Sequence, residues 1–350
     1  MSQLRSPLPL AVALDAPAPP HGSHDAAHYV ALARLAERGG LDFLTLGDGF
    51  ARPGPDALAV LARVAPATER IGLVPAVTTT HTEPFHVSTA VATLDWVSRG
   101  RAGWSVEVST TEAEAALTGR RRAVPPAEAW REAGEVADVA ARLWDSWEDD
   151  AEIRDRAGGR FIDRDKLHYV DFAGTTFTVR GPSIVPRPPQ GRAVIVVDAT
   201  TTADGADGAD GADGAVREVA AAHADVALVR AEDPATAGAA RAALRERARA
   251  HGRDPARLIV LASLPVELES SGDAAGLADL IGDWHAAGAA DGFHLRPADP
   301  VRDLARVVDG TVPLLRDRGL LRRSYTGTTL RDHLGLPRPA SRYAPAREAS

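Results

Sequence analysis

The stretch Leu143–Asp165 reads LWDSWEDDAEIRDRAGGRFIDRD and is the most informative part of this chain. It joins an amphipathic helix, predicted at Ala127–Trp144, to a polar and glycine-rich segment at residues 147–182. On both sides of this segment, short apolar runs alternate with amphipathic stretches. That alternation is typical of a parallel sheet covered by crossover helices. We therefore interpret residues 147–182 as an insertion in a regular α/β fold.

Eight short apolar runs predict eight strands. They are Leu10–Leu14, Phe43–Leu46, Ile71–Val77, Ala102–Val108, Val194–Val197, Val226–Val229, Leu258–Leu261 and Gly292–Leu295. The predicted helices are Ala26–Arg38, Asp56–Val64, Pro84–Ser98, Ala127–Trp144, Ala215–His223, Thr236–Ala250 and Ala274–Ala287. Eight strands in alternation with helices predict a single (β/α)8 TIM barrel. We expect one domain over residues 1–350, with the insertion between helix four and strand five and an extended C-terminal segment.

The composition excludes several classes of function. The chain has 350 residues, 45% of them hydrophobic, which is enough for one large core. A formal net charge of −8 and scattered arginines predict no nucleic-acid partner. The absence of cysteine excludes disulfides and thiolate metal sites, and we expect no metal. No segment approaches the roughly 18 apolar residues of a membrane helix, so we expect a cytoplasmic protein without membrane contact.

Several blocks of sequence resemble one known family. They are LWDSWEDDA (Leu143–Ala151), His81–Trp104, Phe177–Ile195, DGFHLRP (Asp291–Pro297) and Val312–Pro339. In this order they are similar to the nitrilotriacetate and dibenzothiophene-sulfone monooxygenase branch of the bacterial luciferase-like flavin-dependent monooxygenases. Together the blocks span most of residues 40–340.

The resemblance implies a function. A separate flavin reductase would deliver reduced FMN, and a flavin hydroperoxide formed with O2 would insert one oxygen atom into a small organic substrate. The family resemblance also implies a homo-oligomer. Two alternatives stay open: a flavin-poor or inactive barrel that acts as a partner subunit, and a deazaflavin-dependent oxidoreductase. The sequence identifies neither the substrate nor a catalytic residue.

Polar residues follow or end several predicted strands, where a TIM barrel places its reactive groups. They are Asp48, Thr79, Ser105, Glu107, Asp198 and His294. Such residues are more often turn formers or helix caps than catalysts. The resemblance implies that Asp48 and Thr79 line the pocket for the isoalloxazine ring. Ser105 stands where the family has asparagine, and a hydroxyl replaces the amide only in part.

The expected phosphate site departs from the family pattern. Trp130 stands in place of a tyrosine, and its indole offers one N–H donor. After strand five, DATTTADGADGADGADGAV replaces a Gly-Ser-Ser turn, which leaves Thr200 and Thr201 as phosphate ligands. The Ala-Asp-Gly repeat at residues 203–214 is interpreted as a low-complexity loop. Each of its carboxylates within ~6 Å of a phosphate costs about 3 kcal/mol before screening. We therefore predict weakly held FMN.

Two segments outside the predicted barrel are interpreted as covers of its mouth, where they would exclude water. These are the insertion at residues 147–182 and the tail Asp317–Tyr343. Trp144 and Trp147 are predicted to be buried. The acidic run at residues 148–150 is interpreted as a solvated face, or as a contact with Arg154 or Arg156.

Overall fold

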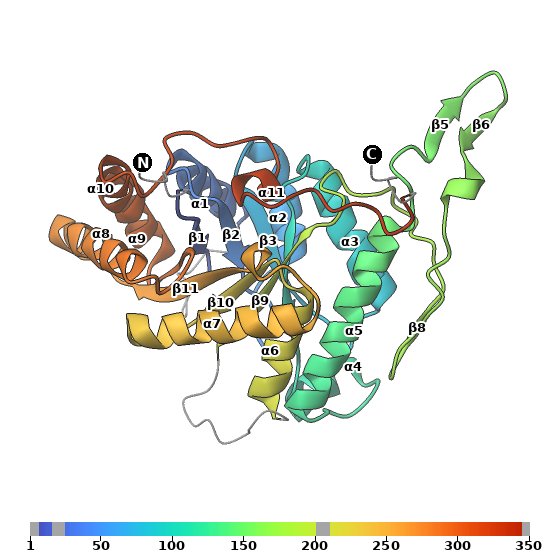
Figure 1. The fold of residues 1–350 in the computed structure, drawn as a ribbon, viewed down its shortest axis with the longest axis horizontal. Coiled ribbons are helices and arrows are strands. Elements are labelled where there is room, and N and C mark those ends of the chain that lie inside the picture. Colours follow the sequence, from blue (N-terminus) through green and yellow to red (C-terminus); the bar gives the residue numbers. More distant parts are fainter. Residues whose placement is uncertain (1–6, 16–24, 201–210, 345–350) are drawn as a thin grey trace.

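The computed structural model describes residues 7–15, 25–200 and 211–344. Eight parallel strands form a closed barrel in the order β1-β12-β11-β10-β9-β4-β3-β2. They are β1 (Leu10–Ala13), β2 (Phe43–Leu46), β3 (Gly72–Thr78), β4 (Gly103–Glu107), β9 (Val194–Asp198), β10 (Val226–Val229), β11 (Ile259–Val266) and β12 (Gly292–Pro297). Figure 1 shows helices around this barrel. The predicted (β/α)8 fold is confirmed.

Most of the helices begin at polar caps or prolines, whereas α6 follows Gly211. They are α1 (Ala26–Arg38), α2 (Ala57–Val64), α3 (Pro84–Val97), α4 (Glu112–Thr118), α5 (Pro126–Asp145), α6 (Ala212–His223), α7 (Pro234–Ala250), α8 (Ser271–Ala286), α9 (Pro300–Arg306), α10 (Val312–Asp317) and α11 (Leu330–His333). Helices α4, α9, α10 and α11 were not predicted from the sequence. Helix α4 begins at a capping box formed by Thr111 and Glu114. No helix in the described ranges is long and apolar enough to cross a membrane.

Helix α6 begins three residues earlier than the sequence predicted. Its first turn contains Asp213, so residues 212–214, the last unit of the Ala-Asp-Gly repeat, are helical. Interpreting the repeat as a loop up to residue 214 was therefore wrong at its end. An aspartate in the first turn of a helix interacts favourably with the helix dipole, which favours this earlier start. Residues 203–210 of the repeat lie outside the described residues.

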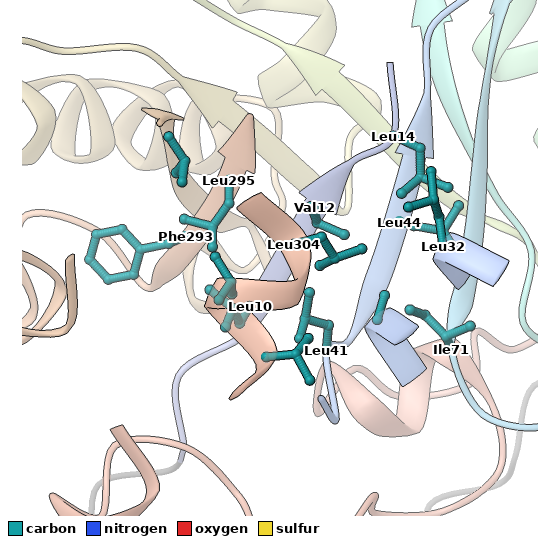
Figure 2. Packing of buried hydrophobic residues seen from close by; sticks show 14 of the residues in the cluster. Leu10, Val12, Leu14, Leu32, Leu41, Leu44, Ile71, Phe293, Leu295 and Leu304 are labelled. Atoms are coloured by element: carbon teal, nitrogen blue, oxygen red, sulfur yellow. The ribbon is translucent and has the colours of Figure 1, made fainter. Parts of the chain in front are cut away.

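The barrel wall is buried on both sides because successive side chains of a strand point to opposite faces. Leu10, Val12 and Leu14 face outward and pack in one cluster with Leu32 of α1 and Leu304 of α9 (Figure 2). The inward-facing residues form a separate cluster, which includes Ala11, Phe43, Val194, Val196, Val226 and Ile259. The side chains inside the barrel are therefore set by strand register.

The C-terminal tail closes the end of the barrel where the strands begin. Leu330, Leu334 and Leu336 belong to the interior cluster, together with the first residues of β9, β10 and β11. Arg331 binds Asp225, directly before β10, with Nη2 2.8 Å from Oδ2. In Figure 1, α11 lies at one end of the barrel and α4 at the other. The prediction that the tail covers the mouth was wrong, because its leucines fill the apolar amino end instead.

The insertion lies against α5. It contains two antiparallel hairpins, β5 (Glu152–Asp155) with β6 (Arg160–Ile162) and β7 (Phe172–Ala173) with β8 (Thr178–Val179). The hydroxyl of Thr175 donates to Oε1 of Glu135, in the middle of α5, at 2.6 Å. Figure 1 shows the β5–β6 hairpin projecting beside this helix. The insertion was therefore wrongly predicted to cover the mouth, whereas the burial of Trp144 and Trp147 is confirmed.

Carboxylates fasten the insertion to the tail. Asp145 is fully buried and accepts hydrogen bonds from Nη2 of Arg187 at 3.2 Å and from Nε of Arg192 at 3.0 Å. Asp149 accepts from Nη2 of Arg338 at 2.6 Å and from Nη1 of Arg187 at 2.9 Å. These bonds, with Arg338 first, lower the pKa of Asp149 to about 2. The central residue of the acidic run is therefore a docking group, and its partners are not the arginines that the sequence suggested.

Candidate active site

His294 lies inside the barrel, below the mouth. Its Nε2 is 3.0 Å from Oγ1 of Thr45, and its Nδ1 is 3.0 Å from Oγ of Ser263. Thr45 belongs to β2, which β1 separates from β12, so this bond crosses the barrel interior. Burial lowers the pKa of His294 to about 4, which keeps the imidazole neutral at pH 7. A neutral imidazole has one donor and one acceptor nitrogen, and the two hydroxyls satisfy both.

Charged side chains surround the mouth one layer above His294. We call this group the charged rim: Asp15, Arg52, Glu107, Asp198, Arg230 and Arg296. Two ion pairs form within it, Arg230 to Asp198 at 2.8 Å and Arg52 to Asp15 at 3.3 Å. The rim therefore presents both signs of charge to any molecule that enters the barrel.

Glu107 is the titratable group at the end of β4. Its side chain is largely buried, and its carboxyl group makes no hydrogen bond within the described part of the chain. Burial, followed by the nearby carboxylates of Asp198 and Asp15, raises the pKa of Glu107 to about 8, although Arg230 and Arg52 act in the opposite direction. At pH 7 this group is mainly a neutral carboxylic acid, which can donate a proton or a hydrogen bond.

Asp48 and Thr79 were predicted to line a cofactor pocket. A pocket of about 510 Å³ lies beside β3, and Asp48, Thr78 and His86 are among its lining residues. The carboxylate of Asp48 accepts hydrogen bonds from the backbone N–H of Gly49 at 2.7 Å and of Ala57 at 2.9 Å. The threonines that line the pocket are Thr78 and Thr82. Thr79 is buried, and its hydroxyl donates to the carbonyl oxygen of Glu107 at 3.0 Å.

Ser105 is buried in β4, between Ala76 of β3 and Val196 of β9. Strand alternation puts it on the inward face with Glu107. Its hydroxyl makes no hydrogen bond to the residues that the structure describes. Ser105 is therefore free to bind a ligand in the barrel.

The remaining predicted residues belong to the expected phosphate site. Trp130 lies half-buried in the second turn of α5, packed against the core. The hydroxyl of Thr200 donates to Oδ1 of Asp198 at 2.5 Å and accepts from the backbone N–H of Arg230 at 3.0 Å. Thr201 lies outside the described residues. The hydroxyl of Thr200 is thus already engaged by the protein.

Four of the six residues that were predicted to bind the cofactor lie in one arc of the mouth. The six are Asp48, Thr79, Ser105, Trp130, Thr200 and Thr201. Asp48, Thr79, Ser105 and Thr200 lie on or after β2, β3, β4 and β9, which are neighbours in the barrel. The opposite arc, formed by β10, β11, β12 and β1, was missed except for His294. The charged-rim residues of this arc are Asp15, Arg230 and Arg296. Each comes two positions after an inward-facing residue, as Arg296 follows His294. The period of two in a strand is the signal that would have found them.

Residues 10–276 match the family model described as luciferase-like monooxygenase. The chain belongs to the luciferase-like monooxygenase family. It is 30% identical to nitrilotriacetate monooxygenase component A of Aminobacter aminovorans, over 93% of both chains. It is 29% identical to dibenzothiophene-sulfone monooxygenase of Rhodococcus erythropolis, over 89% of this chain and 90% of the relative. The resemblance to this branch is confirmed.

A solved structure shows the same fold. The crystal structure of a long-chain alkane monooxygenase (LadA) superposes with a TM-score of 0.83 at 21% identity. The match covers 94% of this chain and 95% of the other. The barrel and the segments added to it therefore have the same overall arrangement in the two proteins.

Proposed function

We propose that this protein is an FMN-dependent monooxygenase that inserts one oxygen atom from O2 into a small organic substrate. The observation that supports this most is family membership over residues 10–276. A partner flavin reductase is part of the proposal. It is supported by the name of one relative, which describes it as component A of its enzyme.

The ring end of FMN fits the residues at the mouth. The pocket of about 510 Å³ has the size of ordinary small-molecule sites. Asp48 and Thr78 line it, and the free hydroxyl of Ser105 faces the barrel interior from β4. We propose that these groups hold the ring. When bound and reduced, FMN supplies the electrons that activate O2.

The phosphate end fits less well. The hydroxyl of Thr200 is already bonded to Asp198, so binding a phosphate there requires that bond to break. Asp198 itself is an anion, although its pairing with Arg230 offsets that charge. We therefore propose that the protein holds FMN weakly and takes it up in the reduced form.

Protein groups then control protons and water. Glu107, protonated at pH 7, is the proton donor at the mouth. His294 stays neutral beneath it because burial lowers the pKa of its imidazole, and hydroxyl groups hold both ring nitrogens. The leucines of the tail seal the opposite end, which keeps bulk water out of the reaction space.

The test uses the purified full-length protein with a flavin reductase and NADH. Flavin fluorescence measures the binding of FMN and of a deazaflavin, and an oxygen electrode measures O2 uptake with polycarboxylates, sulfones and alkanes offered as substrates. We expect FMN binding and O2 uptake coupled to an oxygenated product. Preferential binding of the deazaflavin, or flavin binding without substrate oxygenation, would refute the proposal. The homo-oligomer and the cytoplasmic location stay predictions; light scattering tests the first.

A further inference from the structure

Arg296 points into the mouth of the barrel. It follows His294 by two positions on β12, and the bond from His294 to Thr45 fixes that face as the inward one. Arg296 is half-buried and lies in the electrostatic field of Arg230, Asp198 and Asp15. Its guanidinium group is therefore part of the charged rim and lies above the neutral imidazole.

This guanidinium has no partner among the described residues. Within the described ranges, its Nε is buried without a hydrogen bond and its other nitrogens form no ion pair. Arg187 and Arg322 also have a buried Nε without a bond, but their Nη atoms bind Asp145 and Asp42. A partly buried cation without an anion is unfavourable, and buried charges in proteins are normally paired. Burial and the neighbouring Arg230 lower the pKa of Arg296, as expected for such a group.

The acids of the rim do not satisfy Arg296. Asp198 is paired with Arg230, and Asp15 with Arg52. Glu107 is the third acid, and it is mainly neutral at pH 7. The described rim then contains three guanidinium groups and two carboxylates, which leaves an excess positive charge at Arg296.

We propose that Arg296 binds an oxyanion, so that the small molecule that occupies the mouth carries a carboxylate or a phosphate. A guanidinium matches both groups with two parallel N–H···O bonds. The carboxylate would belong to the substrate and the phosphate to the flavin nucleotide. This proposal rests on the proposed function, because it names the chemistry of a ligand at the same site.

The experiment compares the wild-type protein with Arg296→Met, Arg296→Lys and a control, Arg63→Met. Arg63 is exposed in the last turn of α2 and has no hydrogen-bond or ion-pair partner among the described residues. Flavin fluorescence gives dissociation constants for FMN and for riboflavin, which lacks the phosphate. Thermal shift measures stabilisation by succinate and by inorganic phosphate. Replacing an unpaired cation by a methionine is expected to leave the melting temperature equal or higher, so the variant should fold.

If the phosphate of the flavin is the ligand, wild type prefers FMN over riboflavin, and Arg296→Met lowers that preference about tenfold or more. If a substrate carboxylate is the ligand, this preference is unchanged and stabilisation by succinate is lost. In both cases Arg296→Lys recovers part of the effect and Arg63→Met behaves as wild type. Unchanged anion binding in Arg296→Met, or no anion effect in wild type, would overturn the proposal.

Oxygen uptake measured in parallel separates this inference from the proposed function. Substrate oxygenation with anion binding that does not depend on Arg296 refutes the inference alone. Anion binding through Arg296 without oxygenation of any substrate refutes the monooxygenase proposal alone.

Discussion

Replacing Glu107 by glutamine should make the protein more stable at neutral and alkaline pH. The amide has nearly the same shape as the neutral acid but cannot ionise. In wild type, the pKa of Glu107 rises from 4.5 in the unfolded chain to about 8 in the folded one. Between these values the folded state retains a proton that the unfolded state has released. Stability therefore falls as pH rises, by about 1.4 kcal/mol per pH unit from this group alone.

The magnitude follows from that interval. The difference between 4.5 and about 8 corresponds to about 5 kcal/mol at pH 9, an upper bound, because part of the side chain reaches solvent. At pH 7 the expected gain of Glu107→Gln is about 3 kcal/mol, and near pH 5 it falls below about 1 kcal/mol. The largest effect therefore lies on the alkaline side.

Urea denaturation at pH 5, 7 and 9 measures the difference between wild type and variant. The control is Glu267→Gln, which changes an exposed glutamate on the loop after β11. We expect the control to give a difference that does not change with pH. If the difference in unfolding free energy between Glu107→Gln and wild type also did not change with pH, the carboxyl group would be ionised at neutral pH. Its assignment as a proton donor would then be wrong.

Two further predictions concern the barrel wall and its closed end. A Cβ at Gly292 would lie 2.1 Å from the carbonyl oxygen of Pro9, so Gly292→Ala should lower the free energy of unfolding, measured in urea, by about 3 kcal/mol. The control Gly276→Ala adds a Cβ in open space and should not destabilise the fold. Equal effects of the two substitutions would contradict this packing. Leu330→Ala leaves a cavity at a fully buried position and should lower the free energy of unfolding by about 2–5 kcal/mol. The control Leu314→Ala, at a half-exposed position, should lower it by under about 1 kcal/mol. A small decrease for Leu330→Ala would show that the tail does not seal the barrel.

Most strands could be predicted because barrel strands are buried on both faces and appear as apolar runs. The predicted strand Phe43–Leu46 coincides with β2. Strand β11 was predicted to end at Leu261 but continues to Val266 through Ser263 and Pro265. Pairing with β12 over this length outweighs the local sequence, and Ser263 is polar because it binds His294.

The position of the tail could not be predicted because it depends on contacts between distant parts of the chain. The backbone N–H of Leu330 donates to the carbonyl oxygen of Gly100 at 2.9 Å, across more than half of the sequence. Its short apolar pattern shows that the tail is buried but not where. The candidate site could also be predicted only in part. The period of two in each strand shows that Glu107 and Arg296 face inward, but it does not show which of them has a partner.

Leu330, Leu334 and Leu336 close the amino end of the barrel, so the barrel is open at its carboxyl end alone in the part of the chain that the structure describes. Any molecule that approaches His294 therefore enters and leaves through the mouth. A substrate and a flavin that both use this opening would have to enter one after the other.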